Sequence, residues 1–400
     1  MAIIEMTAAR TVPTEADMIE RARALQPVLR ERAQSTEDNR SVLPETVQDF
    51  VNAGFYRMLQ PAKFGGYEMS PLQLFKVVIE LAKACPSSAW CLGLLTVHNW
   101  EVSLMDPLAA EDLWRDDSNT RFSSSYAPFG KVIQVEGGYR LSGRWSWSSG
   151  ADHCSWVILG GLLPAAEGEP PQLAAFLVQR PDYRVEDVWH VIGLRGTGSN
   201  DIIVDDAFVP HHRVHHFSHS FMMTDPGRAV HNSRNYGYPF GIIFAYSLAT
   251  VTIGMADGAL ECFKEDMKAR RAAYDFSKVM DEPFVRHRLA EAEAIIRGLH
   301  ERLEGNFAEL DHYIDSKTPI PIELRAQNKW DAQWIAKEAQ RAVELLFKAS
   351  GARGLKTDNP MQRYFRDVHA ASNHAFLNPD KGSLNAGLVA LGGATGDLVL

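Results

Sequence analysis

Residues 131–147, KVIQVEGGYRLSGRWSW, decide the class of fold that the sequence predicts. Apolar and polar residues alternate on both sides of Gly137-Gly138, which is typical of two short strands joined by a tight turn. Segments that resemble buried strands follow at residues 155–163, 173–180 and 201–210, with a Pro- and Gly-rich surface loop after the first. No helical segment alternates with these strands, which argues against a doubly wound parallel sheet.

Helical periodicity marks the chain on both sides of this β region. Before it, apolar residues recur at helical spacing from Met18 to Leu29, and Thr14 with Asp17 resembles a capping box. After it, residues 285–314 carry one sustained apolar stripe, and a second long helix is expected over 324–350. We therefore expect an α+β fold with three domains, namely a helical domain at 1–117, a β domain at 118–217 and a helical bundle at 218–400.

The composition restricts the classes of partner. A net charge of −9 and a pI near 5.9, without a basic block, argue against nucleic acid, whose phosphates need concentrated positive charge. The four cysteines form no CxxC pair, which suits a reducing cytosol and predicts no disulfide framework. The first residues lack the basic segment of a signal peptide, and no uninterrupted apolar run reaches eighteen residues. We therefore expect a cytoplasmic protein that binds neither nucleic acid nor membranes.

Several cofactor and metal motifs are missing from the sequence. No GxGxxG follows a strand, and no P-loop, HExxH or GxSxG occurs. The glycine-rich residues 193–200, GLRGTGSN, precede a strand, so we interpret them as a tight connection, with contact to a cofactor phosphate as the alternative. The tract 211–219, HHRVHHFSH, has metal-ligand spacing only if it is helical, and it follows Val209-Pro210 in an expected exposed linker. We predict no metal site.

Two serine-rich segments and two histidines are the candidate functional residues. Residues 123–128, SSSYAP, and 145–150, WSWSSG, place hydroxyl groups beside aromatic rings at strand ends, where they suit a planar heterocycle as well as ordinary turns. His98 lies in an apolar helix, where a lone histidine is usually a satisfied core residue. His374 follows His369 by five residues, which on a helix separates the two side chains by about 140° and disfavours a shared metal.

Taken together, these segments resemble the oxygenase branch of the acyl-CoA dehydrogenase superfamily, the oxygenase components of two-component aromatic hydroxylases. The secosteroid phenol hydroxylase and 4-hydroxyphenylacetate 3-hydroxylase are the members closest in motifs. The resemblance covers nearly the whole chain, and its specificity lies in the order of the motifs, at residues 43–66, 123–130, 147–153, 193–200 and 366–374. It implies an N-terminal helical domain, a central β-barrel or sandwich and a C-terminal helical bundle.

One position separates the branches of this superfamily. Acyl-CoA dehydrogenases commonly carry a catalytic glutamate shortly after a late Arg-Asp pair, whereas here His374 falls near that place, after Arg366-Asp367. An imidazole, with an ordinary pKa of about 6.5, can deprotonate a phenol or hold it by a hydrogen bond. An acyl-CoA dehydrogenase-type oxidoreductase, an N-oxygenase of an amino sugar and a catalytically silent scaffold remain the alternatives.

The resemblance also implies the cofactor and the roles of individual residues. Reduced FMN or FAD, supplied by a separate NAD(P)H-dependent flavin reductase, would react with O₂ to give a C4a-hydroperoxyflavin that hydroxylates a phenolic or indole-like substrate. The catalytic residues would be His374, which polarises or deprotonates the substrate hydroxyl, and Ser149, which bonds flavin N5. His98 and Ser124 would hold the substrate. The implied cofactor contacts are Ser125, Tyr126, Trp147, Ser148 and Ser149.

Two further expectations come from the resemblance. The family is typically homotetrameric, with C-terminal helices helping to complete a neighbour's flavin site. The 4-hydroxyphenylacetate enzyme has an arginine linked to flavin handling near the start of the long helix after the β domain. Residues 239–251, PFGIIFAYSLATV, have none, and their apolar character favours an uncharged or bulky aromatic substrate.

Overall fold

The computed structural model describes residues 12–165, 168, 171–231, 233–272 and 275–400. Helices come first, strands follow, and helices return, which confirms the predicted α+β class. The first helices are α1 (Glu15–Asn39), α2 (Pro44–Ala53), α3 (Pro71–Ala82), α4 (Pro86–Val102) and α5 (Pro107–Trp114). The strands are β1 (Phe122–Val135), β2 (Gly138–Ser148), β3 (Trp156–Leu163), β4 (Gln172–Gln179), β5 (Tyr183–Glu186), β6 (Asn200–Pro210) and β7 (Val214–His216). The last helices are α6 (Phe217–Met222), α7 (Pro226–Val230), α8 (Phe240–Ala269), α9 (Pro283–Asp315), α10 (Ile322–Ser350), α11 (Pro360–Ser372) and α12 (Pro379–Ala390).

Local signals in the sequence explain where these elements begin. At α1, the Asp17 N–H donates to Thr14 Oγ1 at 3.2 Å and the Thr14 N–H donates to Asp17 Oδ2 at 2.7 Å, which confirms the predicted capping box. The change from helices to strands falls between Trp114 and Phe122, and the change back falls between His216 and Phe217. The division into three domains at 117/118 and 217/218 stays a prediction.

Over the described part of the chain, the strands form one seven-stranded sheet in the order β5-β6-β2-β1-β3-β4-β7, in which only β1 and β3 pair in parallel. The hairpin predicted at Gly137-Gly138 is present, but β1 and β2 are 14 and 11 residues long, not short. The pairing register shifts between Ser125 and Gly130 where β1 pairs β3. Where β2 pairs β6, it shifts between Leu141 and Gly143 and again between Trp145 and Ser148. Such bulges interrupt a ladder and re-aim side chains.

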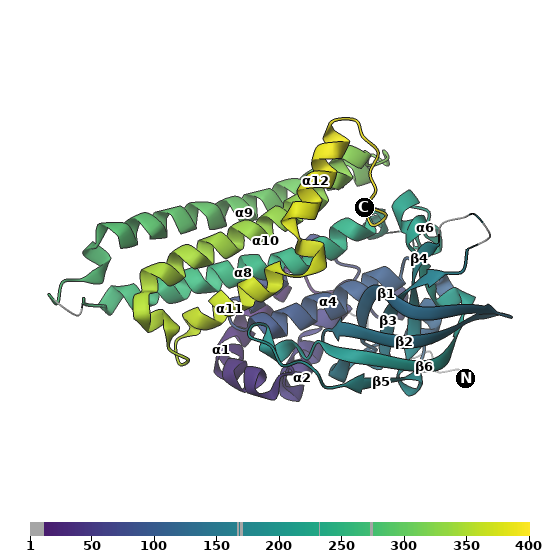
Figure 1. Cartoon of the computed structure of the whole chain (residues 1–400), viewed down its shortest axis with the longest axis horizontal. Helices are drawn as coiled ribbons and strands as arrows, with labels where there is room; N and C mark the ends of the chain where they lie inside the picture. The colour runs from purple at the N-terminus through teal and green to yellow at the C-terminus, as the bar shows by residue number, and fades with distance from the viewer. Residues whose placement is uncertain (1–11, 166–167, 169–170, 232, 273–274) are drawn as a thin grey trace, which may run out of the picture.

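Three long helices, α8, α9 and α10, lie side by side and extend away from the sheet (Figure 1). Helix α8 has the length and hydropathy of a membrane span, but 94% of its most apolar window is buried inside the protein. It is therefore the central helix of the core, packed on α3, α4 and α10. Helix α4 is buried along its whole length between α3, α8 and the sheet, and it brings His98 to the sheet side of the core.

Candidate functional site

A cavity of about 290 Å³ opens where β1, β2, α4, α8 and the turn after α11 meet. Its volume lies at the lower end of small-molecule sites, which span roughly 300–1,000 Å³. Its lining contains seven of the eight predicted site residues, namely His98, Ser124, Ser125, Tyr126, Trp147, Ser149 and His374. The remaining side chains are mostly apolar, from Leu94, Ala127, Leu173, Phe217, Phe244, Ala375, Phe376 and Val399, together with Ser146. The fold thus gathers into one place predicted site residues that are up to 276 positions apart, from His98 to His374.

Ser148 is the one predicted site residue that does not line the cavity. Its side chain is fully buried, and its hydroxyl donates to Ser123 Oγ at 2.8 Å. Ser125, by contrast, lines the cavity while donating to the Ser146 carbonyl at 2.8 Å, which ties β1 to β2 at the two bulges. Ser148 therefore supports the wall of the site through Ser123.

His374 enters the cavity from beyond the end of α11, not from the helix. It caps the short 3₁₀ turn Ala375–Leu377, because its Nδ1 accepts the Phe376 N–H at 3.2 Å. A neutral imidazole whose Nδ1 accepts must carry its proton on Nε2. Burial lowers the pKa of His374 to about 4, so the neutral form prevails at neutral pH. His374 is therefore a hydrogen-bond donor towards the cavity, which favours the polarising role over the deprotonating one.

His98 has the opposite hydrogen-bonding capacity. It is 1% exposed, and its Nδ1 lies 2.9 Å from Glu101 Oε2, one helical turn further along α4. The Tyr126 hydroxyl, whose pKa is raised well above its usual range by burial and by Glu101, donates to the same carboxylate oxygen. A carboxylate accepts, so the proton of neutral His98 lies on Nδ1 and Nε2 keeps a free lone pair. His98 is thus placed as a base, held by a carboxylate as in a histidine–aspartate pair.

Glu101 was not among the predicted site residues, and the predicted location of His215 is wrong. His215 was expected in an exposed linker, but it is 2% exposed and its Nδ1 lies 2.9 Å from Glu101 Oε1. The i,i+3 spacing of His98 and Glu101 in an apolar helix is a signal that could have identified Glu101. His215 gave no such signal, because only the return of β7 to the sheet edge brings it to α4. Within the described ranges, no three His, Cys, Asp or Glu side chains are grouped to hold a metal ion.

Val399 was also missed, and it reaches the cavity from the last residues of the chain. Lys329 of α10 donates to the Val399 carbonyl at 2.9 Å and pairs with Asp397 at 2.6 Å. These contacts hold the segment against α8, where a Cβ on Gly241 would lie 1.7 Å from the Val399 carbonyl oxygen. No periodicity or motif in the sequence indicates this contact.

Ser149 is held by two partners behind the cavity wall. Its Oγ accepts the Trp90 indole N–H at 3.1 Å and shares a hydrogen bond with Ser199 Oγ at 2.8 Å. Ser199 in turn bonds Thr197 Oγ1 at 2.7 Å, so the glycine-rich segment 193–200 contributes hydroxyls that fix Ser149. The segment is the tight connection into β6 that the sequence predicted, with Leu194 and Gly198 both at positive φ.

The residues present fit the ring system of a flavin. Two of the register shifts take residues 126–129 and 146–147 out of the regular pairing with β3 and β6, so polar backbone edges border the cavity. Serine hydroxyls stand beside them, and the Trp147 indole at the rim is 65% exposed. Trp147 also has φ of +68°, a conformation that costs energy for a bulky residue and that concentrates at ligand sites. A planar aromatic cofactor would cover the exposed indole.

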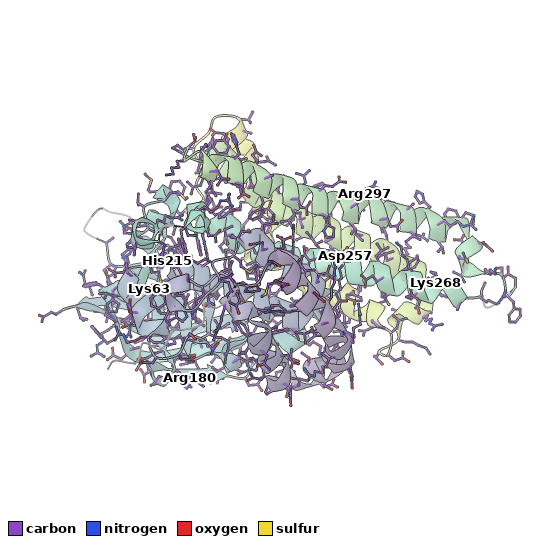
Figure 2. All side chains as sticks on the ribbon, turned by 180° about the vertical axis from the view of Figure 1, so that it is seen from behind. Lys63, Arg180, His215, Asp257, Lys268 and Arg297 are labelled. Atoms are coloured by element: carbon purple, nitrogen blue, oxygen red, sulfur yellow. The ribbon has the colours of Figure 1, made fainter. Side chains whose placement is uncertain are left out.

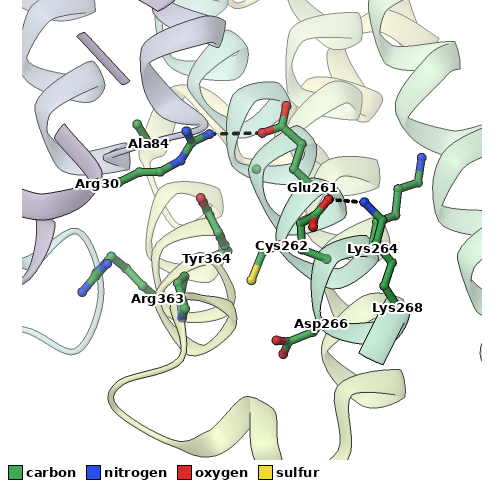
Figure 3. A pocket seen from close by; sticks show the side chains of 12 residues that line it. Arg30, Ala84, Glu261, Cys262, Lys264, Asp266, Lys268, Arg363 and Tyr364 are labelled. Carbon is green, nitrogen blue, oxygen red and sulfur yellow. Dashed lines mark hydrogen bonds and ion pairs between the residues drawn. The ribbon is translucent and has the colours of Figure 1, made fainter. Parts of the chain in front are cut away.

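A second, larger cavity of about 640 Å³ lies between α1, α8 and α11 (Figure 3). Its charged groups are paired, some with one another, as in the Arg30–Glu261 pair at 3.2 Å, and some with residues outside the lining, as in Lys264–Glu293. The thiol that lines it, Cys262, has its pKa raised to about 11 by burial, which makes it a poor nucleophile. None of the predicted site residues lines this cavity. The chemistry therefore belongs to the smaller cavity.

Known proteins share both the sequence and the fold. Residues 14–105 match the family model "Acyl-CoA dehydrogenase, N-terminal domain", and residues 246–379 match "Acyl-CoA dehydrogenase, C-terminal domain". The oxygenase subunit HsaA of a flavin-dependent monooxygenase from Rhodococcus jostii (strain RHA1) is 40% identical over 364 residues, 91% of this chain and 95% of the relative. The oxygenase component of an FADH₂-dependent resorcinol hydroxylase from Rhizobium sp. is 30% identical and covers 91% of each chain. The crystal structure of 3-HSA hydroxylase from Rhodococcus sp. RHA1 superposes with a TM-score of 0.92 at 38% identity, covering 96% of this chain and 99% of that one.

These matches confirm the resemblance that the sequence motifs indicated, and they cover nearly the whole length of this chain and of each relative. They also confirm the expected enzyme class, because the relatives are flavin-dependent monooxygenases and hydroxylases by name. The protein therefore belongs to the acyl-CoA dehydrogenase superfamily and, within it, to the oxygenase components of two-component flavin-dependent aromatic hydroxylases.

Proposed function

We propose that this enzyme hydroxylates an uncharged phenolic substrate beside its hydroxyl group, with His98 as the base and His374 as the donor that holds the phenolate oxygen. The observation that carries the proposal is that two histidines of opposite hydrogen-bonding capacity face one apolar cavity. Among the residues that the structure describes, no carboxylate lines this cavity, so an acyl-CoA dehydrogenase reaction would lack its base there. An amino sugar is also disfavoured, because its many hydroxyls would meet mostly apolar side chains.

The reduced flavin would activate O₂ and supply the oxygen atom, and the protein's own residues would prepare the substrate. The substrate O–H proton moves to Nε2 of His98, and the new imidazolium keeps its Nδ1–H on Glu101. The phenolate oxygen accepts the Nε2–H of His374, and its charge makes the neighbouring ring carbon more nucleophilic. Ser124, beside His98 in the lining, would hold the substrate hydroxyl in place. For the ring to become aromatic again, the hydrogen on the hydroxylated carbon would leave as a proton to the second oxygen atom of O₂, which would end as water. The proton on His98 would return to the product oxygen.

The aromatic lining supports a flat, apolar substrate. Phe244 of α8 lies between His98 and Phe376 in the lining. The centroid of its ring is 6.0 Å from that of His98 and 4.8 Å from that of Phe376. It comes from the arginine-free stretch at residues 239–251, so that stretch does face the site. An indole N–H could donate to His98, but its nitrogen cannot accept from His374, and it is a far weaker acid than a phenol. We therefore place indole-like substrates second.

The remaining assignments are part of the same proposal. The cofactor would be reduced FAD in preference to FMN, as in the name of the resorcinol hydroxylase, with Ser125, Tyr126, Trp147 and Ser149 at the flavin. An NAD(P)H-dependent reductase would supply it in the cytoplasm. A homotetramer is supported by exposed leucines at helical spacing on α12 and its C-cap, Leu384, Leu388 and Leu391, which are 75%, 49% and 90% exposed.

The proposal is tested by loading the purified protein anaerobically with reduced FAD, or with reduced FMN in parallel, and mixing it with O₂ and a phenol. We expect a product with a second hydroxyl ortho to the first, in a yield that approaches one per flavin oxidised. Quantitative release of hydrogen peroxide, with every phenol and indole recovered unchanged, would contradict the proposed function. Bleaching of bound oxidised flavin by an acyl-CoA would support the dehydrogenase reaction instead.

Ser149→Ala is expected to uncouple oxygen consumption from hydroxylation while reduced flavin still binds. The hydroxyl that would bond the flavin is lost, and the Trp90 indole N–H loses its acceptor. One hydrogen bond contributes about 0.5–1.5 kcal/mol, so the ratio of hydrogen peroxide to product should rise several-fold. Ser350→Ala is the control, since this buried hydroxyl donates only within α10, to the Leu346 carbonyl. An unchanged ratio in Ser149→Ala would remove Ser149 from the site.

A further inference from the structure

A chain of buried polar side chains extends from His98 away from the cavity. Glu101 lies 2.9 Å from His98 through Oε2 and 2.9 Å from His215 through Oε1. On its other side, His215 Nε2 lies 2.7 Å from Ser220 Oγ, and the Ser220 hydroxyl donates to Asp225 Oδ1 at 2.6 Å. Figure 2 places His215 in the part of the molecule that contains the sheet. The chain therefore joins the candidate base to a second, interior set of charges.

The hydrogen-bond directions fix the charge of His215. Because Ser220 uses its proton on Asp225, its oxygen must accept from His215 Nε2. Glu101 accepts from Nδ1, so both ring nitrogens of His215 are donors and the ring is an imidazolium. Arg228 neutralises Asp225 through a contact of 2.6 Å. The buried carboxylate of Glu101 is thereby left with His215 as its counter-ion.

The pKa shifts agree with this charge count. Burial by itself lowers the pKa of His215, but hydrogen bonds with Asp225 and Glu101 outweigh it and raise the pKa to about 9. Burial by itself raises the pKa of Glu101, but His215 and His98 lower it to about 2. The neighbouring His216 does not compete for the positive charge, because burial and the imidazoles of residues 219, 215 and 211 lower its pKa to about 4.

We propose that His215 is a positioning residue that supplies the positive charge for Glu101 and so leaves His98 neutral and able to accept the substrate's proton. The inference rests on the proposed function, since it concerns the base of that reaction. A buried carboxylate requires one compensating charge. If His215 did not provide it, Glu101 would stabilise a proton on His98, and the base would be occupied before a substrate bound. Asp225 and Ser220 act one step further out, by holding His215 in its charged form.

The proposal predicts a pH-dependent defect in His215→Gln. Glutamine can donate to Glu101 but carries no charge, so His98 becomes the counter-ion. We expect activity at pH 7 to fall by about tenfold or more and to recover at higher pH, with the acid side of the profile displaced upward by about one unit or more. His300→Gln is the matched control, because His300 pairs with Asp257 at 3.1 Å in the helical bundle, away from His215 (Figure 2). An equal loss at every pH would show that His215 is merely structural and would overturn the proposal.

Two measurements do not depend on activity and separate this inference from the proposed function. Nitrogen NMR of the unaltered protein at pH 7 should show protons on both nitrogens of His215 and on Nδ1 alone of His98, and a singly protonated His215 would overturn the inference.

The second measurement is the pH dependence of stability. Since the folded-state pKa of His215 is raised from about 6.5 to about 9, the stabilisation of the folded protein by His215 is complete below pH 6.5 and is lost as pH rises through 9. The unfolding free energy should fall over this range, and it should fall less in Ser220→Ala, which loosens the same chain without removing the imidazole. An equal slope in that variant would contradict the charge assignment.

Discussion

Replacing His98 with asparagine is expected to lower phenol hydroxylation by about 10²–10⁴-fold, the usual contribution of a general base, while reduced flavin still binds. The asparagine amide can still donate to Glu101, but it offers no lone pair where His98 Nε2 faces the cavity. The loss should therefore fall on kcat and not on flavin affinity. Single-turnover product formation with pre-bound reduced flavin measures the effect directly.

The acidity of the substrate gives this prediction a second, independent readout. A phenol that is already ionised at the assay pH needs no base, so the defect of His98→Asn should shrink as more acidic phenols are used. His369→Gln is the matched control, because His369 pairs with Glu344 at 2.9 Å on α11 and does not line the cavity. A defect of the same size with every phenol would assign His98 to substrate binding and not to proton transfer. In that case the base would have to be sought at His374.

Replacing Gly160 with alanine is expected to lower the free energy of unfolding by about 1–3 kcal/mol, the cost of overpacking a filled core. Gly160 lies on β3 opposite the bulge in β1, and a Cβ there would lie 2.1 Å from the Tyr126 carbonyl oxygen and 2.8 Å from its Cα. The clash is with backbone, so β1 must move. The Gly160 carbonyl also accepts the Trp145 indole N–H at 2.8 Å, which ties β2 to the same position on β3.

The displacement in Gly160→Ala should also reach the site, because Ser125 and Tyr126 belong to the displaced segment and line the cavity. Chemical denaturation measures the stability, and titration with reduced FAD measures the site. Gly298→Ala is the control, and it should change stability in the opposite direction. Gly298 is exposed on α9, with nothing within 4 Å of the position that a Cβ would take. Alanine there should raise the free energy of unfolding by about 0.5–1 kcal/mol. If both variants were equally stable, β1 would not be held against β3 as the structure shows.

The sequence by itself determined the class of fold and seven of the sixteen residues that line the cavity. Alternation around Gly137-Gly138 and the long apolar stripes depend on neighbouring residues, so local patterns suffice to place strands between helices. The site residues were found through motif order, and seven of them do share one cavity. Ser148 is the exception, because a change of one position along a strand turns a side chain to the other face of the sheet.

The tertiary structure alone decided the charges and the proton positions. His374 accepts from Phe376 and His98 donates to Glu101, so two residues of the same type become a donor and an acceptor, which no residue pattern distinguishes. His215 changes from an expected surface histidine to a buried cation because β7 carries it to α4, 114 positions away in the sequence. Burial and the charge compensation of Glu101 depend on partners that are distant along the chain, such as His215. They exist only once the chain has folded.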